Sequence, residues 1–291
     1  MTRMRALAAI FIAAAIMVPK ATAQGSIEPI PLVKDIPPRD GTDVVGVRLG
    51  EKREDALVIL RKGYPDAKIV EKNYTYRLRD NRSNMVTIMF PNEASLFFET
   101  NRLRENITLY FTSPATGNRV WGIERSVHYK ELIDTATTRS AIIKKYGTPT
   151  LIERYDHQNR LEITYTYEKR PVKSFGEVDV LKRHFAEPRP DQRNACLNAA
   201  TSNAYGRDRR YGYSSPTNGM RKPNPGWDVC IGGLSFKFFY GANTQTIYKM
   251  EVSANDFDRT LVDAQLLDAT LLKLIEAKAG AVRGKTDAPK L

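Results

Sequence analysis

Three stretches of the chain carry apolar side chains at the spacing of an amphipathic helix. The first covers residues 52–62, where Leu57, Leu60 and Tyr64 fall on one face and Gly63 ends the pattern. Because a helix with one apolar stripe must bury that stripe, this pattern predicts a helix that packs on a partner surface.

The second helical stretch follows Asp134 or Thr135, either of which can serve as its N-cap, and it stops at Gly147 ahead of Pro149. The third covers residues 258–277 and is rich in leucine. We expect the tail after it, residues 280–291, to be frayed.

Most of the remaining pattern alternates between apolar and polar positions, which predicts strands. The clearest case is a hairpin of residues 107–112 and 119–128, connected through the turn residues Pro114, Gly117 and Asn118. The further predicted strands cover residues 44–50, 67–78, 85–90, 96–99, 151–155, 161–167, 230–241 and 246–254.

The regions around the first two helices are similar to each other. The segment ILRKGYPDAKIVE (59–71) aligns with IIKKYGTPTLIER (142–154). We therefore predict the α+β class, with two helix-plus-strands repeats that form a mainly antiparallel sheet with helices packed on one face. The repeats cover residues 43–130 and 131–279, the second with an inserted loop at 186–229. A chance similarity of amphipathic helices is the alternative explanation.

The N-terminal residues have the pattern of a secretory signal peptide. Arg3 and Arg5 precede the apolar run 6–18, and the ATA at 21–23 fits a cleavage site, so we leave residues 1–23 out of the fold. The apolar run is too short to span a bilayer comfortably.

Residues 24–42 are rich in proline and predict an extended linker. A lipid anchor would require a cysteine just after the apolar run, and none precedes Cys196. We therefore expect a periplasmic or secreted protein with no transmembrane segment once the signal peptide is cleaved.

The chain is basic, with a formal net charge of +12 at pH 7. Part of this charge belongs to the signal peptide, which holds Arg3, Arg5 and Lys20. The remainder favours acidic partners, such as anionic lipid headgroups, lipopolysaccharide phosphates, an anionic polysaccharide or an acidic protein face. Nucleic acid is not expected in that compartment. The alternative is that the charge only keeps the protein in solution.

Cys196 and Cys230 are the two cysteines of the chain. In an oxidising compartment they most simply pair, and a disulfide would close a long loop and stabilise the fold by about 3 to 4 kcal/mol. A metal site is the alternative, but His128, His157 and His184 show no ligand spacing. We expect no metal and no other cofactor.

Arginine and tyrosine interleave in the segment between the cysteines. Both side chains offer large contact area with polar ends, which suits a binding surface. A solvated insertion is the alternative interpretation. The candidate binding residues are Tyr205, Arg207, Arg209, Arg210, Tyr211, Tyr213 and Arg221.

The chain shows no motif for nucleophilic catalysis, which requires a Ser or Cys with a His and an acid. Ser235 lies in an alternating strand, and His157 sits in a turn beside Asp156. Gly232 and Gly233 alone do not make a phosphate loop. We therefore predict no catalytic residues.

The order of a GVRLG strand end, a helix, strands, a hairpin and then IIKKYGTP resembles the beta-lactamase inhibitor protein-like superfamily. That superfamily includes the small lipoprotein of the outer-membrane barrel assembly machine. The chain resembles most the uncharacterised exported proteins of Gram-negative bacteria with the same motifs, over residues 43–255. The resemblance implies an α+β scaffold used for protein contacts, and it offers no catalytic residue to transfer.

Two functions follow as hypotheses. The first is an exported, non-enzymatic protein that binds a protein or an anionic envelope component through its sheet face or the loop between the cysteines. The second is an envelope hydrolase that acts on glycan or peptide with unrecognised acidic residues. Two acids in a deep cleft would favour the hydrolase, and a shallow basic surface would favour the binding protein.

Overall fold

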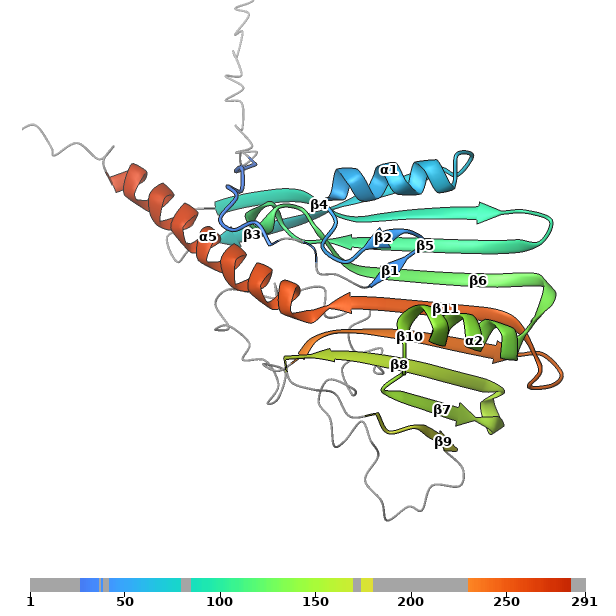
Figure 1. Cartoon of the computed structure of the whole chain (residues 1–291). Coiled ribbons are helices and arrows are strands. Elements are labelled where there is room, and N and C mark those ends of the chain that lie inside the picture. The colour runs from blue at the N-terminus through green and yellow to red at the C-terminus, as the bar shows by residue number, and fades with distance from the viewer. Residues whose placement is uncertain are drawn as a thin grey trace, which may run out of the picture.

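A nine-stranded, mainly antiparallel sheet forms the centre of the protein, with strand order β3-β4-β5-β6-β11-β10-β8-β7-β9 (Figure 1). The computed structural model describes residues 27–36, 38, 42–79, 85–169, 174–179 and 230–283. Only β7 and β9 pair in parallel among these strands. The sheet and the helices that pack on it confirm the α+β class.

The strands of this sheet are β3 (Ile69–Arg79), β4 (Met85–Glu99), β5 (Leu103–Phe111), β6 (Val120–Asp134), β7 (Leu151–Tyr155), β8 (Arg160–Glu168), β9 (Glu177–Asp179), β10 (Cys230–Tyr240) and β11 (Thr246–Asp256). The α-helices of the described residues are α1 (Arg53–Gly63), α2 (Thr135–Tyr146) and α5 (Phe257–Arg283). The internal repeat and the boundaries of its two units stay predictions.

The predicted strand at 44–50 is wrong, because this segment folds back on itself as a small hairpin. Its strands are β1 (Asp43–Val44) and β2 (Val47–Arg48). Val45 and Gly46 between them both have positive φ, of 52° and 82°. Two consecutive left-handed residues close a tight two-residue turn, and a β-branched valine gives no sequence signal for one.

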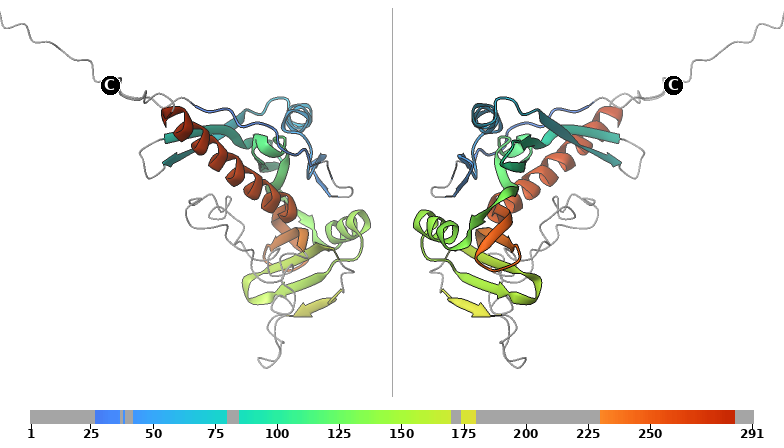
Figure 2. Two further views of the ribbon diagram at one scale, coloured as in Figure 1. Left: turned by 90° about the vertical axis from the view of Figure 1, so that its left-hand side faces the viewer. Right: turned by 90° about the vertical axis from the view of Figure 1, so that its right-hand side faces the viewer.

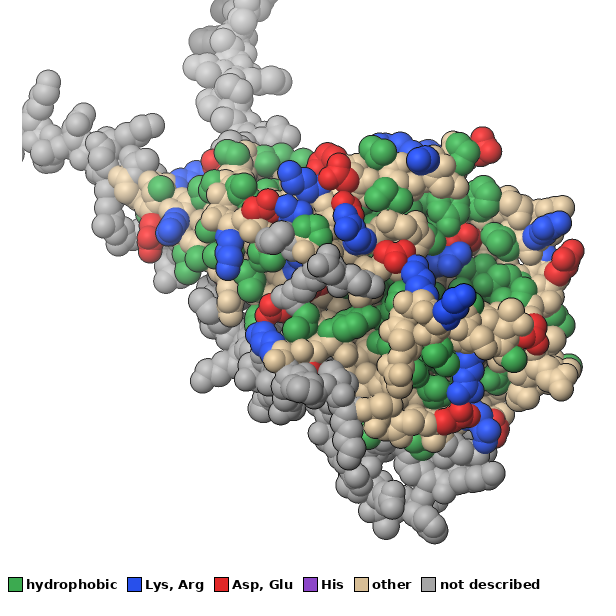
Figure 3. Space-filling view, in the orientation of Figure 1, with side chains coloured by type: hydrophobic (Ala, Val, Ile, Leu, Met, Phe, Trp, Pro, Cys, Tyr) green, Lys and Arg blue, Asp and Glu red, His purple; other side chains and the backbone are tan. Residues whose placement is uncertain are grey.

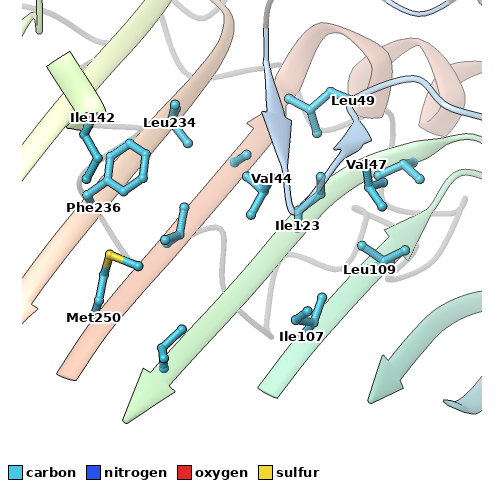
Figure 4. Close-up of a cluster of buried hydrophobic side chains, with 14 of the residues drawn as sticks. Val44, Val47, Leu49, Ile107, Leu109, Ile123, Ile142, Leu234, Phe236 and Met250 are labelled. Atoms are coloured by element: carbon cyan, nitrogen blue, oxygen red, sulfur yellow. The ribbon is translucent and has the colours of Figure 1, made fainter. Parts of the chain in front are cut away.

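Helices α1 and α2 cover one face of the sheet, with the β1–β2 hairpin between them (Figure 1). Helix α1 buries Leu57 and Leu60, as its spacing predicts, and α2 buries Ile142. Their partners on the strands include Leu109, Phe236 and Met250 (Figure 4). Asp134 caps α2, because its carboxylate accepts a hydrogen bond from the Thr137 amide at 2.6 Å.

Helix α5 lies on the opposite face, so the expectation that all helices pack on one face is wrong (Figure 2). Leu267 and Leu271 pack there against Ile88 of β4 and Trp121 of β6. Tyr110 belongs to this second cluster, whereas its neighbour on the strand, Leu109, belongs to the first. Since adjacent strand residues point to opposite faces, the two clusters lie on opposite sides of the sheet.

A bulge in β4 supplies apolar side chains to both clusters. The pairing with β3 shifts between Lys72 and Asn73, which leaves Asn92 unmatched. Before the bulge Ile88 and Phe90 face α5, and after it Leu96 faces α1. The extra residue reverses which side of the sheet the even-numbered side chains of β4 face. The two predicted strands, 85–90 and 96–99, are therefore parts of one continuous strand that the bulge interrupts.

The predicted hairpin around Pro114, Gly117 and Asn118 is confirmed as β5 and β6. The predicted strands at 151–155 and 161–167 are confirmed and pair as β7 and β8, and those at 230–241 and 246–254 are confirmed and pair as β10 and β11. Helix α5 continues to Arg283, six residues beyond the predicted end.

Residues 27–36 and 38, here called the N-terminal strap, run across the end of the sheet. The Glu28 amide donates to the Thr87 carbonyl at 2.8 Å, and the Val33 amide donates to the Ala115 carbonyl at 2.8 Å. Arg119 donates two hydrogen bonds to Asp35, which holds the pKa of that carboxyl below its usual value. The strap is thereby fixed to the β5–β6 connection.

A buried carboxylate joins α5 to the same connection. Asp263 is fully buried and accepts hydrogen bonds from the Ser113 amide at 2.9 Å, the Ser113 hydroxyl at 2.6 Å and the Thr116 hydroxyl at 2.5 Å. Buried charges are tolerated only when hydrogen bonds of this kind replace water. Arg259, one turn earlier on α5, donates to the carbonyl of Ile36 in the strap.

Asp263→Ala should destabilise the protein strongly, because it leaves three buried donors without their acceptor. We expect a loss of about 3 kcal/mol or more in the free energy of unfolding, measured by urea denaturation. Asp268→Ala is the matched control on the same helix. Burial raises the pKa of Asp268, so removing that carboxyl should change stability by less than about 1 kcal/mol. Equal losses in both variants would contradict the role given to Asp263.

Candidate functional site

The sheet face opposite α1 and α2, beyond the part that α5 covers, is polar across several strands and is here called the polar face. It arises because β5, β6, β11, β10 and β8 alternate, with apolar residues toward α1 and α2 and polar residues away from them. The strand pairing aligns these polar residues in rows.

The inner row crosses four strands and consists of charged residues. Glu251, Lys237, Glu162 and Glu153 lie directly opposite one another in turn, on β11, β10, β8 and β7. The Lys237 Nζ is 3.9 Å from Glu162 Oε1, and the Tyr155 hydroxyl donates to Glu153 at 3.0 Å. The row thus places Glu153 and Glu162 side by side, with the Lys237 ammonium group between Glu162 and Glu251.

Glu162 is the most buried acid in this row. It is 3% exposed, and its Oε1 has no hydrogen-bond donor. Burial raises the pKa of Glu162 to about 7, against the attraction of Lys237 and Arg160 and together with repulsion from Glu153 and Glu251. Glu162 can therefore be a neutral proton donor near neutral pH, whereas most glutamates are ionised.

The outer row is more exposed and has mixed charge. Arg104 of β5, His128 of β6 and Lys249 of β11 lie opposite one another. Burial, followed by the charges of Lys249 and Arg104, lowers the pKa of His128. Hydrogen bonds from Lys130 and Arg104 lower the pKa of Glu99 at the end of this row.

Aromatic side chains accompany the charges of the outer row. Phe97 is 50% exposed, and the Arg104 guanidinium lies 5.9 Å from its ring centre. Lys249 lies 4.8 Å from the Phe239 ring, which in turn is 6.5 Å from the ring of Tyr248. Exposed aromatic rings beside cations are typical of surfaces that bind other proteins.

The candidate binding residues between the cysteines all lie outside the described residues, as does Cys196. They are Tyr205, Arg207, Arg209, Arg210, Tyr211, Tyr213 and Arg221. Cys230 opens β10, and its pairing with Cys196 stays a prediction. The binding role of the loop is likewise still a prediction.

Of the residues considered for chemistry, Ser235 is a buried strand residue opposite Thr164 and Ser253. His157 lies in a short 3-10 turn, Asp156–Gln158, and His128 in the outer row. Sequence reasoning missed Glu153, Glu162 and Lys237. In the sequence each is a charged residue within an alternating strand, which gives no sign of a site. The pairing of the strands places the three residues next to one another.

The charge excess of the chain is not on the part that the structure describes. The described residues carry nearly as many acidic as basic side chains. On the face with α1 and α2 the two signs are interspersed (Figure 3). Most of the excess lies in segments outside the described residues, including the one with Arg207, Arg209 and Arg210.

Comparison with family models, curated proteins and solved structures finds no match for this chain. The resemblance to the beta-lactamase inhibitor protein-like superfamily therefore stays an expectation. Over the described residues, no helix combines the length and the apolar composition needed to cross a bilayer.

The raised pKa of Glu162 predicts a specific pH dependence of stability. The folded state keeps this proton up to pH 7 or so, while the unfolded chain loses it near 4.5, so stability falls as pH rises between these values. The wild type should lose about 3 kcal/mol relative to Glu162→Gln across that range and nothing further above it. Urea denaturation at pH 4.5, 6 and 8 measures this difference.

Glu131→Gln, a change at an exposed carboxyl on β6, is the control and should track the wild type at each pH. A Glu162→Gln variant whose stability parallels the wild type throughout would show that Glu162 ionises normally.

Proposed function

We propose that this chain is an exported, non-enzymatic protein that binds another protein through the outer row of the polar face. The observation that carries the proposal is the combination, on one exposed strand surface, of Phe97, Arg104 and Lys249 with the ring pair Phe239 and Tyr248. Aromatic and arginine side chains supply most of the energy at protein interfaces. A sheet also presents them on a rigid backbone, so little freedom is lost on binding.

The charge pattern favours a protein partner over an anionic lipid or polysaccharide. Glu99, and Glu251 of the adjoining inner row, lie among the bases Arg104, Lys130 and Lys249, and each acid is within ion-pair distance of a lysine. The acids would repel a polyanion and so weaken its attraction to the bases. A protein surface of alternating charge can match both signs.

Export and the binding class rest on sequence. The basic n-region, apolar run and ATA site support a signal peptide, and the resemblance supports a scaffold for protein contacts. A basic loop between Cys196 and Cys230 would give the same protein a second surface, one that binds anions.

The test is capture from an envelope extract with the mature protein, followed by binding measurements with the identified and purified partner. Phe97→Ala combined with Arg104→Ala should weaken that binding by at least about tenfold, because the two changes remove the most exposed ring of the proposed surface and its arginine. The pair Arg61→Ala and Lys144→Ala, on the exposed sides of α1 and α2, is the control and should not change the affinity.

The triple change of Arg207, Arg209 and Arg210 to Ser separates the loop from the sheet face. An affinity that falls only in this triple variant would reject the polar face as the binding surface and assign binding to the loop. An unchanged affinity in the triple variant, with loss in the Phe97 and Arg104 variant, supports the proposal.

The second candidate is an envelope hydrolase, and Glu153 and Glu162 are the observation that favours it. A neutral acid beside a second carboxyl group can protonate a leaving group while the second group activates water. Both side chains are at least nine-tenths buried, which favours the binding function, because a hydrolase must expose its acids to substrate.

If this chain is a hydrolase, Glu162→Gln and Glu153→Gln should each reduce the rate of cleavage by at least about 100-fold. The wild-type rate should also fall above pH 7, where Glu162 loses its proton. Purified peptidoglycan and casein are the substrates to assay. Cleavage that survives both substitutions would exclude this pair as the catalytic acids.

A further inference from the structure

Strand β3 forms one edge of the sheet and pairs with β4 only, among the described residues. It is long for an edge strand, with 11 residues. Most of its side chains are exposed, and Val70 is 46% exposed although it is apolar. Natural proteins usually shorten, bend or cover such an edge, because its outward amide and carbonyl groups can pair with another strand.

The sequence of β3 is complementary to itself when read in the antiparallel direction. Two copies that pair over their full length place Tyr74, the middle residue, on the two-fold axis. In that register Glu71 lies opposite Arg77, and Asn73 lies opposite Thr75. The two-fold axis repeats both pairs, so the interface gains two ion pairs and no like-charge contact between them.

Two neighbouring registers compare as follows. With Asn73 on the axis, Glu71 meets Thr75 and Lys72 meets Tyr74, so no opposite charges are paired. With Thr75 on the axis, Glu71 meets Arg79, but Ile69 and Val70 have no residue of β3 opposite them. The register centred on Tyr74 pairs opposite charges and also uses the full length of the strand, so it is the favoured one.

The local contacts of these residues are compatible with that pairing. Glu71 forms an ion pair with Arg53 at the start of α1, and its side chain is 33% exposed. A carboxylate has about four acceptor sites, so it can accept from Arg53 and from a second arginine together. Arg77 is exposed on the same strand face as Glu71.

We propose that two copies of this chain associate through β3, edge to edge and antiparallel, to form one continuous sheet across a two-fold axis. Main-chain hydrogen bonds between the two strands supply the affinity. The paired charges of Glu71 and Arg77 set the register. This surface is independent of the polar face, and the dimer carries two copies of that face in a fixed arrangement.

Charge reversal tests the proposal, with sedimentation velocity of the mature protein over a range of concentrations as the measurement. Arg77→Glu places two acids opposite each other twice per dimer and should raise the dissociation constant about tenfold to 100-fold. Adding Glu71→Arg to Arg77→Glu restores two opposite-charge pairs and should recover most of the affinity. Such recovery requires that the two residues meet across the interface.

Arg61→Glu, on the exposed side of α1, is the control for net charge and should leave the dissociation constant unchanged. Because Glu71→Arg also faces Arg53, circular dichroism and thermal unfolding of each variant establish that it is folded. A wild type that stays monomeric at all concentrations would overturn the proposal. A dimer that Arg77→Glu leaves unchanged, or that the double variant does not restore, would overturn it equally.

Discussion

The hydrogen bonds that Asp263 accepts join α5 to the connection between β5 and β6, in the middle of the sheet. A buried carboxylate without donors would cost several kcal/mol, so the Ser113 amide and the hydroxyls of Ser113 and Thr116 must reach it for α5 to dock. Close to this cluster, Arg259 donates a hydrogen bond to the Ile36 carbonyl and Arg119 donates to the Asp35 carboxylate, both in the N-terminal strap. The position of α5 on the sheet, and therefore the extent of the polar face that it leaves uncovered, depends on this polar cluster together with the packing of Leu267 and Leu271.

The bulge at Asn92 explains how a single sheet supports two separate cores. A strand without it would direct Ile88, Phe90 and Leu96 to the same side of the sheet, so β4 would contribute to one core only. With it, Phe90 packs toward α5 and Leu96 toward α1. Similar register shifts lie at Trp121 in β6 and at Tyr248 in β11, and between these points the strands farther from β3 keep one apolar face and one polar face.

Local patterns allowed much of the fold to be predicted from sequence. Leu57 and Leu60 mark α1, Asp134 marks the start of α2, and the turn around Gly117 marks the β5–β6 hairpin, because each signal lies within a few residues of its effect. The turn at Val45 was missed because valine rarely has positive φ. The side of the sheet that α5 occupies depends on the Asn92 bulge, and no local pattern encodes it.

The polar face likewise has features that local patterns predict and features that they do not. That β8 and β10 would each have a polar side follows from their alternation. That Glu162 would face both Glu153 and Lys237 depends on the register of three strands, which side-chain patterns do not fix when the connection between them is long. The Cys196 to Cys230 segment was predicted to bind a partner from its composition alone. The charged rows of the sheet consist of residues that carry no such signal individually.

The N-terminal strap has a consequence for the order in which the protein can fold. Its contacts join residues far apart in the chain: Glu28 pairs with Lys278 across 250 residues, and Ile36 accepts from Arg259 across 223. Contacts of such separation form late, since the intervening chain must be ordered first. The strap can therefore complete its contacts only after α5 has been synthesised, and this side of the sheet stays open until then.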